Sequence, residues 1–389
     1  MLNRLGDSKT HKTILSSSAA DKKILWLSRH NKYLVVVPPM DKIIKRVYLG
    51  ETDKQIVKYC NNELGFSSND SRQILNDIRN TLEKELKVEK VQSSVNSIQI
   101  ENINRKFECQ HFYKINGLTF LIEFETPKLE FYIHPKFAHL EILKAENTNH
   151  HLQLFEVDNK ICLKLDEEVV GCWDHEMEHF MSGKVSMEIL QKITDTKETD
   201  WMAVFHAAGV SFNNQGLLFL GDSGNGKSTL SAILMANGFN ILADDFLPVL
   251  NETSQLCSFP AAISVKKYAI DLLAAQFPEL KDAKEYEFPA FNKTVRYLSN
   301  PYATTGEPKK VKCKALVFVK YEPGSNIDVK NLPKDEAFQK LVPDSWISPE
   351  EKNAKQFLNW FEKLPCWQIK YSNNEAMVET VRKIFEDEL

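Results

Sequence analysis

The stretch GDSGNGKS, residues 221–228, decides how the second half of this chain is interpreted. It lies between an apolar run, GLLFL (216–220), and a segment of helical character, TLSAILMANG (229–238). The pattern G-x-x-x-x-G-K-S is met in full, in the strand–loop–helix context that gives the pattern its meaning. Backbone N–H groups of such a loop face phosphate oxygens, and the start of the helix adds a favourable electric field. The stretch therefore predicts a site for the phosphate groups of a nucleotide.

This phosphate site implies ATP and Mg²⁺ as cofactors. The lysine supplies a cation for the β and γ phosphates, and the serine hydroxyl is a ligand for Mg²⁺. The residues expected to bind the cofactor are Gly221, Asp222, Ser223, Gly224, Asn225, Gly226, Lys227, Ser228 and Thr229.

Two adjacent carboxylates follow the predicted helix. After a C-cap at Asn237-Gly238, the apolar stretch FNILADDF (239–246) delivers Asp244 and Asp245 to the end of the next strand. We predict that Asp244 and Ser228 hold the metal ion, and that Asp245 accepts the proton of an attacking hydroxyl. The alternative is a pair of solvated aspartates in a turn, capping the next element.

Two further side chains are candidates for the same site. His206, in VFHAAGV, comes before the strand that feeds the loop, although a lone histidine in an apolar run is usually a core residue. Arg296 is the candidate for an arginine that meets the transferred phosphoryl group, with Lys293 as a second choice. Surface or structural charges are the alternative for both cations.

The combination of these segments resembles the HPr kinase/phosphorylase family, whose catalytic domain is built like that of phosphoenolpyruvate carboxykinase. The run from His206-Ala207 through the loop to Ala243-Asp244-Asp245 carries the resemblance, which covers roughly residues 105 to 385. By this resemblance, His206 lines the phosphate site, Lys227 and Ser228 bind nucleotide and Mg²⁺, and Asp245 is the acid/base on the acceptor serine. HPr kinase proper usually has Glu where this chain has Thr229, so the resemblance does not extend to HPr as the acceptor.

The chain organisation predicts a mixed α/β (α+β) fold with a P-loop catalytic domain like that of HPr kinase and a small N-terminal domain of winged-helix type. A hairpin (24–37) ends at Pro38-Pro39, and two amphipathic helices follow, the first opened by a Thr52–Gln55 capping box. Hairpin turns are predicted at Asn116-Gly117 and Asp158-Asn159. The expected divisions are a flexible tail (1–22), the N-terminal domain (23–95), a strand-rich part ending in a helical stretch (96–200) and the kinase core (201–389), with strand and helix alternating in the core.

The N-terminal domain resembles, in the order of its elements, the PqqD-like domains that present leader peptides to modifying enzymes. The resemblance implies that an exposed strand edge captures an extended peptide by β-augmentation. A structural or dimerising winged helix is the alternative, and a homo-oligomer stays open.

Composition excludes several classes of partner. The net charge of −4 over 389 residues provides no general attraction for nucleic acid. No apolar window of about 18 residues is present to span a membrane. The seven cysteines are scattered without CxxC pairs, which favours reduced thiols and a cytoplasmic location.

A second motif competes with the nucleotide site. Residues 175–179 read His-Glu-Met-Glu-His, a literal H-E-x-x-H that on a helix would place two imidazoles around Zn²⁺. The third histidine of the longer metzincin pattern is replaced by Val185, and only Glu188 or Glu198 offers a later ligand. A solvated charged helix is the favoured interpretation.

These observations together predict a kinase that transfers the γ-phosphoryl group of ATP to a serine or similar hydroxyl of a peptide, protein or small molecule. A kinase of small hydroxylated metabolites and a nucleotide-gated binding protein without phosphoryl transfer remain the alternatives.

Overall fold

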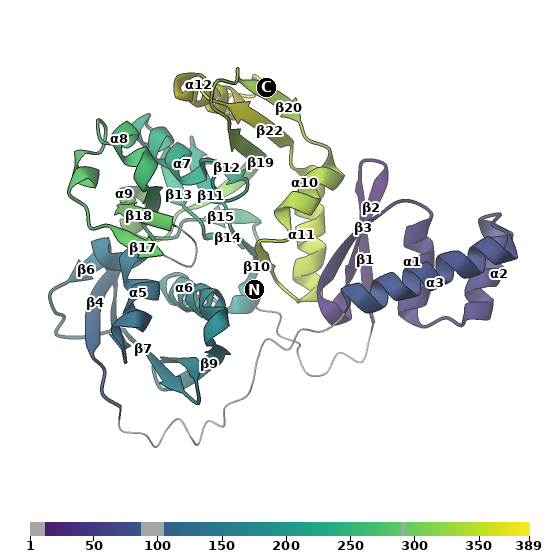
Figure 1. Ribbon diagram of the computed structural model, residues 1–389, viewed down its shortest axis with the longest axis horizontal. Coiled ribbons are helices and arrows are strands. Elements are labelled where there is room, and N and C mark those ends of the chain that lie inside the picture. Colours follow the sequence, from purple (N-terminus) through teal and green to yellow (C-terminus); the bar gives the residue numbers. More distant parts are fainter. Residues whose placement is uncertain (1–11, 87–104, 289–292) are drawn as a thin grey trace.

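The computed structural model describes residues 12–86, 105–288 and 293–389. It confirms the mixed α/β class: the described residues form a small N-terminal sheet with helices, a six-stranded sheet, a larger ten-stranded sheet and a short three-stranded sheet (Figure 1). None of the described helices combines the length and the apolar character that crossing a bilayer requires.

The N-terminal unit consists of three antiparallel strands followed by three helices, in the order β1 (Ile14–Ala19), β2 (Lys22–Leu27), β3 (Lys32–Val36), α1 (Met40–Leu49), α2 (Asp53–Glu63) and α3 (Ser68–Glu85). The predicted hairpin and the capping box of Thr52 and Gln55 are confirmed. The prediction of a flexible tail over residues 1–22 is wrong for β1, which pairs along its whole length with β2. Residues 1–11 and 87–104 lie outside the described part.

The side chains of β2 point alternately into two different cores, and one of these cores belongs to the rest of the protein. Leu25 and Leu27 face a core shared with α1, α2 and α3, whereas Ile24 and Trp26 face the main core. On that second face, the ring of Tyr33 contacts the C-terminal helices α10 (Lys334–Leu341) and α11 (Glu351–Lys363). The N-terminal sheet therefore packs between its own helices and α10 and α11 (Figure 1).

The six-stranded sheet has the order β6-β4-β5-β7-β8-β9. Its strands are β4 (Cys109–Ile115), β5 (Leu118–Phe124), β6 (Glu141–Ile142), β7 (His150–Val157), β8 (Lys160–Leu165) and β9 (Glu168–Asp174). Both predicted hairpin turns are confirmed, since Asn116-Gly117 and Asp158-Asn159 adopt positive φ between paired strands. Helices α5 (Pro127–Phe137) and α6 (Glu178–Thr194) pack in the same core as this sheet. Only part of the predicted helical stretch 171–200 is α-helix, because its first residues belong to β9.

Two cysteines of this sheet form a disulfide, which corrects the prediction of reduced thiols throughout. Cys162 and Cys172 lie directly opposite each other on β8 and β9, with their Cα atoms 4.1 Å apart. The pairing of the two strands brings together thiols that look scattered in the sequence. Five described cysteines remain free thiols: Cys60, Cys109, Cys257, Cys313 and Cys366.

The ten-stranded sheet carries the glycine-rich loop, defined as residues 221–226. Its path is β13-β11-β12-β19-β15-β14-β10-β21, with β22 beside β19 and β20 beside β22. The strands are β10 (Trp201–Phe205), β11 (Ala208–Phe212), β12 (Gln215–Leu220), β13 (Asn240–Ala243), β14 (Leu247–Leu250), β15 (Gln255–Cys257), β19 (Lys310–Tyr321), β20 (Asp328–Asn331), β21 (Ser345–Ile347) and β22 (Cys366–Tyr371). Strands β10, β11 and β12 follow one another without a helix, so strict strand–helix alternation from residue 201 is wrong.

Helices α7 (Lys227–Ala236) and α12 (Asn374–Phe385) pack against one face of this sheet, and α11 belongs to the core on the other face. Next to α7 lies the antiparallel sheet of β16 (Ile263–Lys266), β18 (Lys293–Leu298) and β17 (Tyr286–Phe288), with the short helices α8 (Ile270–Leu273) and α9 (Pro301–Thr304).

Short connections show that the ten-stranded sheet curls. Strands β10 and β11 stand five places apart in the sheet order, about 24 Å if the sheet were flat. Only residues 206 and 207 join them, however, which limits the span to about 11 Å. Residues 244–246 likewise join β13 to β14, near opposite ends of the order. The curl therefore brings His206 and the Asp244–Asp245 pair to the same side of the molecule.

Candidate functional site

The glycine-rich loop runs from the end of β12 to the first residue of α7. Gly226 is the residue before α7 and has φ of 88°, a conformation that residues with a β-carbon seldom adopt. A β-carbon at Gly221 would lie 2.6 Å from the carbonyl oxygen of Val319. The backbone N–H of Tyr321 donates to the carbonyl of Asn225 (3.2 Å), so the loop is seated against the end of β19.

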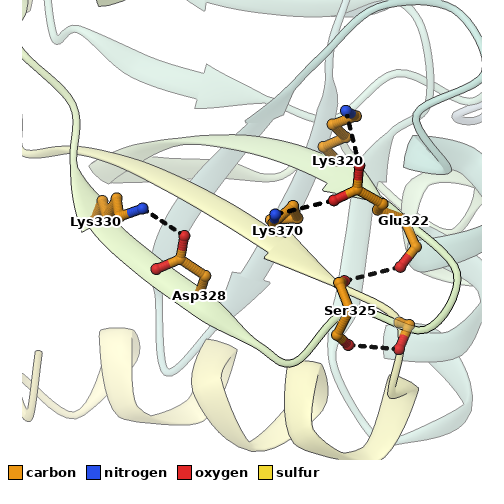
Figure 2. Close-up of polar contacts among 7 residues, drawn as sticks. Lys320, Glu322, Ser325, Asp328, Lys330 and Lys370 are labelled. Atoms are coloured by element: carbon orange, nitrogen blue, oxygen red, sulfur yellow. Dashed lines mark hydrogen bonds and ion pairs between the residues drawn. The ribbon is translucent and has the colours of Figure 1, made fainter.

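Three ion pairs lie near this end of β19, formed by residues at the end of β19 and on the neighbouring strands β20 and β22 (Figure 2). Glu322 bridges Lys320 (3.3 Å) and Lys370 (3.0 Å), and the backbone N–H of Glu322 donates to the carbonyl of Tyr371. The two lysines lower the pKa of Glu322 through hydrogen bonds, Lys370 first. These pairs are exposed and contribute little stability.

Lys227 is buried, with 6% of its surface exposed, and its ammonium donates a hydrogen bond to the carbonyl of Gly221. The side chain thus folds back over the loop, where its positive charge faces the inside of the loop. Ser228 follows in the first turn of α7, and its hydroxyl lies near the carboxyl group of Asp244. Thr229 is half-buried in the same turn.

Asp244 is held inside the protein. Its Oδ2 accepts a hydrogen bond from the backbone N–H of Ser264 (3.1 Å). Its Oδ1 is also buried but has no hydrogen-bond partner among the described residues. Burial, followed by the nearby charge of Asp245, raises the pKa of Asp244 to about 7. A buried carboxylate oxygen without a partner, close to the Ser228 hydroxyl, is the donor set that Mg²⁺ prefers.

Asp245 has a different environment although it is the next residue. It has φ of 67°, the left-handed region, and its side chain is 37% exposed. The Nε2 atom of His206 lies 3.7 Å from Oδ1 of Asp245. The carboxylate thus points into solvent-accessible space beside an imidazole, where it can meet a ligand.

A cavity of about 790 Å³ borders the glycine-rich loop and the aspartate pair. Its lining includes Ser223 of the loop, His206, Asp244 and Asp245. The rest of the lining is largely apolar and includes an aromatic wall, defined as Phe131, Tyr132, Phe180, Phe205, Phe246, Phe259, Tyr268, Phe288, Tyr297 and Trp346. The volume lies within the range of small-molecule and cofactor sites.

Four lysines line the cavity: Lys136 of α5, Lys266 of β16, Lys267 directly after β16, and Lys293 of β18. Burial lowers the pKa of Lys136 to about 8, an effect that Asp245 partly offsets, and its ammonium donates to Ser182 Oγ (2.7 Å). Burial also lowers the pKa of Lys266, followed by the charges of Lys293 and Lys227. These cations make the cavity suitable for an anionic ligand. No local pattern marked Lys136 or Lys266, because only tertiary packing brings α5 and β16 to the loop.

Arg296, the predicted arginine for the transferred phosphoryl group, is not among the residues that line the cavity. Its guanidinium donates to the carbonyls of Leu280 and Lys281 and pairs with Glu285. Of the residues of β18, Lys293, Thr294 and Tyr297 line the cavity, and Arg296 is held outside it by these contacts. Lys293, the second choice, is the cation that reaches the site.

The H-E-x-x-H stretch crosses a junction between two helix types. Residues His175–Met177 form a 3₁₀ turn and His179 lies in the first turn of α6. His175 lies 3.7 Å from Glu156, and Glu188 and Glu198 both pair with Lys184. The two histidines are in no metal-binding group of the described residues. The structure therefore gives no support to a zinc site at this motif.

Comparisons with known proteins add little to this geometry. No protein-family model and no curated protein matches the chain. Among solved structures, the chain is similar to the Hpr(Ser) kinase/phosphatase from Coxiella burnetii, with 11% identity over 48% of this chain and 95% of the other, and a TM-score of 0.22. At this TM-score the similarity is weak, and the functional argument rests on the residues of the cavity.

Proposed function

We propose that the protein is an ATP- and Mg²⁺-dependent kinase that transfers the γ-phosphoryl group to a serine or similar hydroxyl of a peptide or protein. One observation carries the proposal: a single cavity is lined by Ser223 of the glycine-rich loop, a buried carboxylate, an exposed carboxylate beside an imidazole, and several lysines. A site that only held nucleotide would not need the exposed acid.

We assign phosphate binding and metal binding to different residues of the site. Loop amides, Lys227, Lys266 and Lys293 bind the phosphate oxygens and offset their charge. Ser228 and Asp244 would hold Mg²⁺, which neutralises charge between the β and γ phosphates.

In the transfer step, the acceptor hydroxyl oxygen forms the new bond to the γ-phosphorus as the bond to the β–γ bridging oxygen breaks. Asp245 takes the hydroxyl proton, and ADP leaves with the electron pair of the broken bond. General-base help of this kind contributes about 10²–10⁴-fold to the rate.

The aromatic wall favours a peptide or protein acceptor over a small polar metabolite. Ten aromatic side chains line the same cavity as Asp245. Aromatic surfaces bind apolar groups, which amino-acid side chains next to a serine can supply and polyhydroxylated metabolites lack.

The N-terminal sheet is a second place where a peptide could bind. Its outer strands in the described part are β1 and β3, and pairing of an extended peptide with such a strand would be β-augmentation. We propose this sheet as the leader-peptide site; a peptide that carries its leader should then be phosphorylated with a lower KM than the same peptide without the leader, at unchanged ATP affinity.

The test of the function uses γ-labelled ATP, a library of serine-containing peptides and a panel of hydroxylated metabolites. We expect label on peptides, loss of transfer in Asp245→Asn and unchanged ATP affinity in that variant. Asp271→Asn, the same change at an exposed aspartate of α8 away from the cavity, is the control. Label on metabolites alone would favour the small-molecule kinase, and ATP binding without any labelled product would favour the nucleotide-gated binding protein.

A further inference from the structure

A group of potential metal ligands lies outside the cavity, on the six-stranded sheet. His111 on β4, His134 in α5 and Glu141 at the start of β6 each offer one ligand atom, and these atoms lie within 4.8 Å of one another. Strand pairing places Tyr113 of β4 opposite Glu141, and α5 packs against β4. None of the three potential ligands lines the cavity.

Neighbouring side chains fix the two imidazoles. The ring of His134 stacks on that of His111 at a centroid distance of 4.1 Å and is 8% exposed. Its Nδ1 is 2.9 Å from the hydroxyl of the buried Tyr113. When Nδ1 carries the proton and donates it to the phenol oxygen, Nε2 has a free lone pair for a metal ion. Metal-binding histidines are usually oriented through their other ring nitrogen in this way.

Negative charge exceeds positive charge in this group. The two ring nitrogens of His111 contact Glu141 (2.5 Å) and Glu130 (2.9 Å). Neither carboxylate forms an ion pair with a lysine or arginine of the described residues. A divalent cation would balance both carboxylates, whereas one protonated imidazole balances only one.

We propose that His111, His134 and Glu141 form a binding site for a divalent transition metal of the zinc type, with Glu130 as the nearest further carboxylate. Imidazole nitrogen and carboxylate oxygen are common zinc ligands. Bonds of about 2.0–2.2 Å to a tetrahedral ion require ligand atoms about 3.3–3.5 Å apart. The carboxylate of Glu141 must therefore move away from Nδ1 of His111, which it contacts at 2.5 Å, to admit an ion between them. The side chain of Glu141 is 40% exposed and can make this adjustment, and its exposure also gives the ion a route from solution.

The proposed ion has a structural role. It would connect β4, β6 and α5, and α5 also carries Phe131 and Lys136 into the cavity. Metal binding would therefore hold one wall of the cavity in place. The site does not depend on the proposed kinase activity, since ion binding is measured without any turnover.

The experiment measures zinc bound to the full-length protein. Metal-free protein is titrated with Zn²⁺ by calorimetry, and zinc content after gel filtration is measured by mass spectrometry. We expect about one zinc per chain for the wild type, none retained in His134→Ala or Glu141→Gln, and binding about 10–100-fold weaker in Tyr113→Phe. Because Glu141 is partly exposed, Glu141→Gln tests the site even if the buried His134→Ala variant fails to fold.

The H-E-x-x-H stretch provides the matched control. His175→Ala and His179→Ala also remove imidazoles, but at positions outside the proposed group, and should keep wild-type zinc binding. The proposal is overturned if the wild type binds no zinc, if Glu141→Gln binds as tightly as the wild type, or if zinc is lost in His175→Ala.

Discussion

Gly221 and Gly224 lie in the same loop, but alanine at each position would meet different surroundings. A β-carbon at 221 would be 2.6 Å from the backbone oxygen of Val319, whereas nothing lies within 4 Å of one at 224. Both glycines have positive φ, 153° and 98°. Strand β19, which contains Val319, pairs with β12 and β22, so the oxygen cannot move away cheaply. Gly221→Ala and Gly224→Ala therefore separate steric crowding from backbone strain.

The expected losses in unfolding free energy follow from these contacts. Positive φ costs alanine about 1–2 kcal/mol, and the stiffer unfolded chain returns about 0.4–1 kcal/mol. Gly224→Ala should thus lose about 0–1.6 kcal/mol. Crowding against a fixed backbone atom adds about 1–3 kcal/mol, so Gly221→Ala should lose about 1–4.6 kcal/mol.

The assay is urea unfolding of both variants, compared through the midpoint and slope of each transition. Affinity for a fluorescent ATP analogue is measured on the same samples. We expect Gly221→Ala to lose this affinity, because the added β-carbon would push the loop away from the end of β19. Equal destabilisation of the two variants would refute the described packing of the loop. Unchanged ATP affinity in a strongly destabilised Gly221→Ala would refute the link between that packing and phosphate binding.

Three other predictions concern the cavity and the disulfide. Lys293→Ala should lower phosphoryl transfer by about 10²-fold through loss of a cation at the phosphates, whereas Arg296→Ala should lower the melting temperature and leave kcat nearly unchanged; the reverse pattern would restore Arg296 to the site. Lys136→Met should reduce kcat/KM without changing ATP affinity, as measured by initial rates and equilibrium binding, and a normal kcat/KM would exclude Lys136 from acceptor binding. Reducing the disulfide of Cys162 and Cys172, which closes a loop of sequence separation 10, should cost about 2–3 kcal/mol of stability in chemical denaturation and leave transfer intact in the folded protein; no loss of stability would contradict the bond's structural role.

Features set by neighbouring residues could be predicted from the sequence. The turns at Asn116-Gly117 and Asp158-Asn159 depend on residues that tolerate positive φ, and the cap of α2 depends on Thr52 and Gln55 three positions apart. Helix α1 was missed although its signal was present: Ile44 and Tyr48 lie four positions apart on its buried side.

Features set by distant contacts could not be predicted. Lys136 follows a proline inside α5 in an otherwise ordinary segment, and it enters the cavity because α5 packs across from the loop. Arg296 and Lys293 are three positions apart on one strand, and only the orientation of β18 decides which of them faces the site. His111 and Glu141 are thirty positions apart and meet through the pairing of β4 with β6. In each case the sequence supplied the side chain and the tertiary fold supplied its neighbours.

The most direct measurement of the central claim is a ³¹P NMR time course of the protein with Mg²⁺, ATP and a pool of serine-containing peptides. A phosphate monoester signal should grow in step with ADP, disappear in Asp245→Asn and persist in Asp271→Asn. Growth of ADP with inorganic phosphate alone, or a monoester signal of undiminished rate in Asp245→Asn, would contradict phosphoryl transfer assisted by this carboxylate.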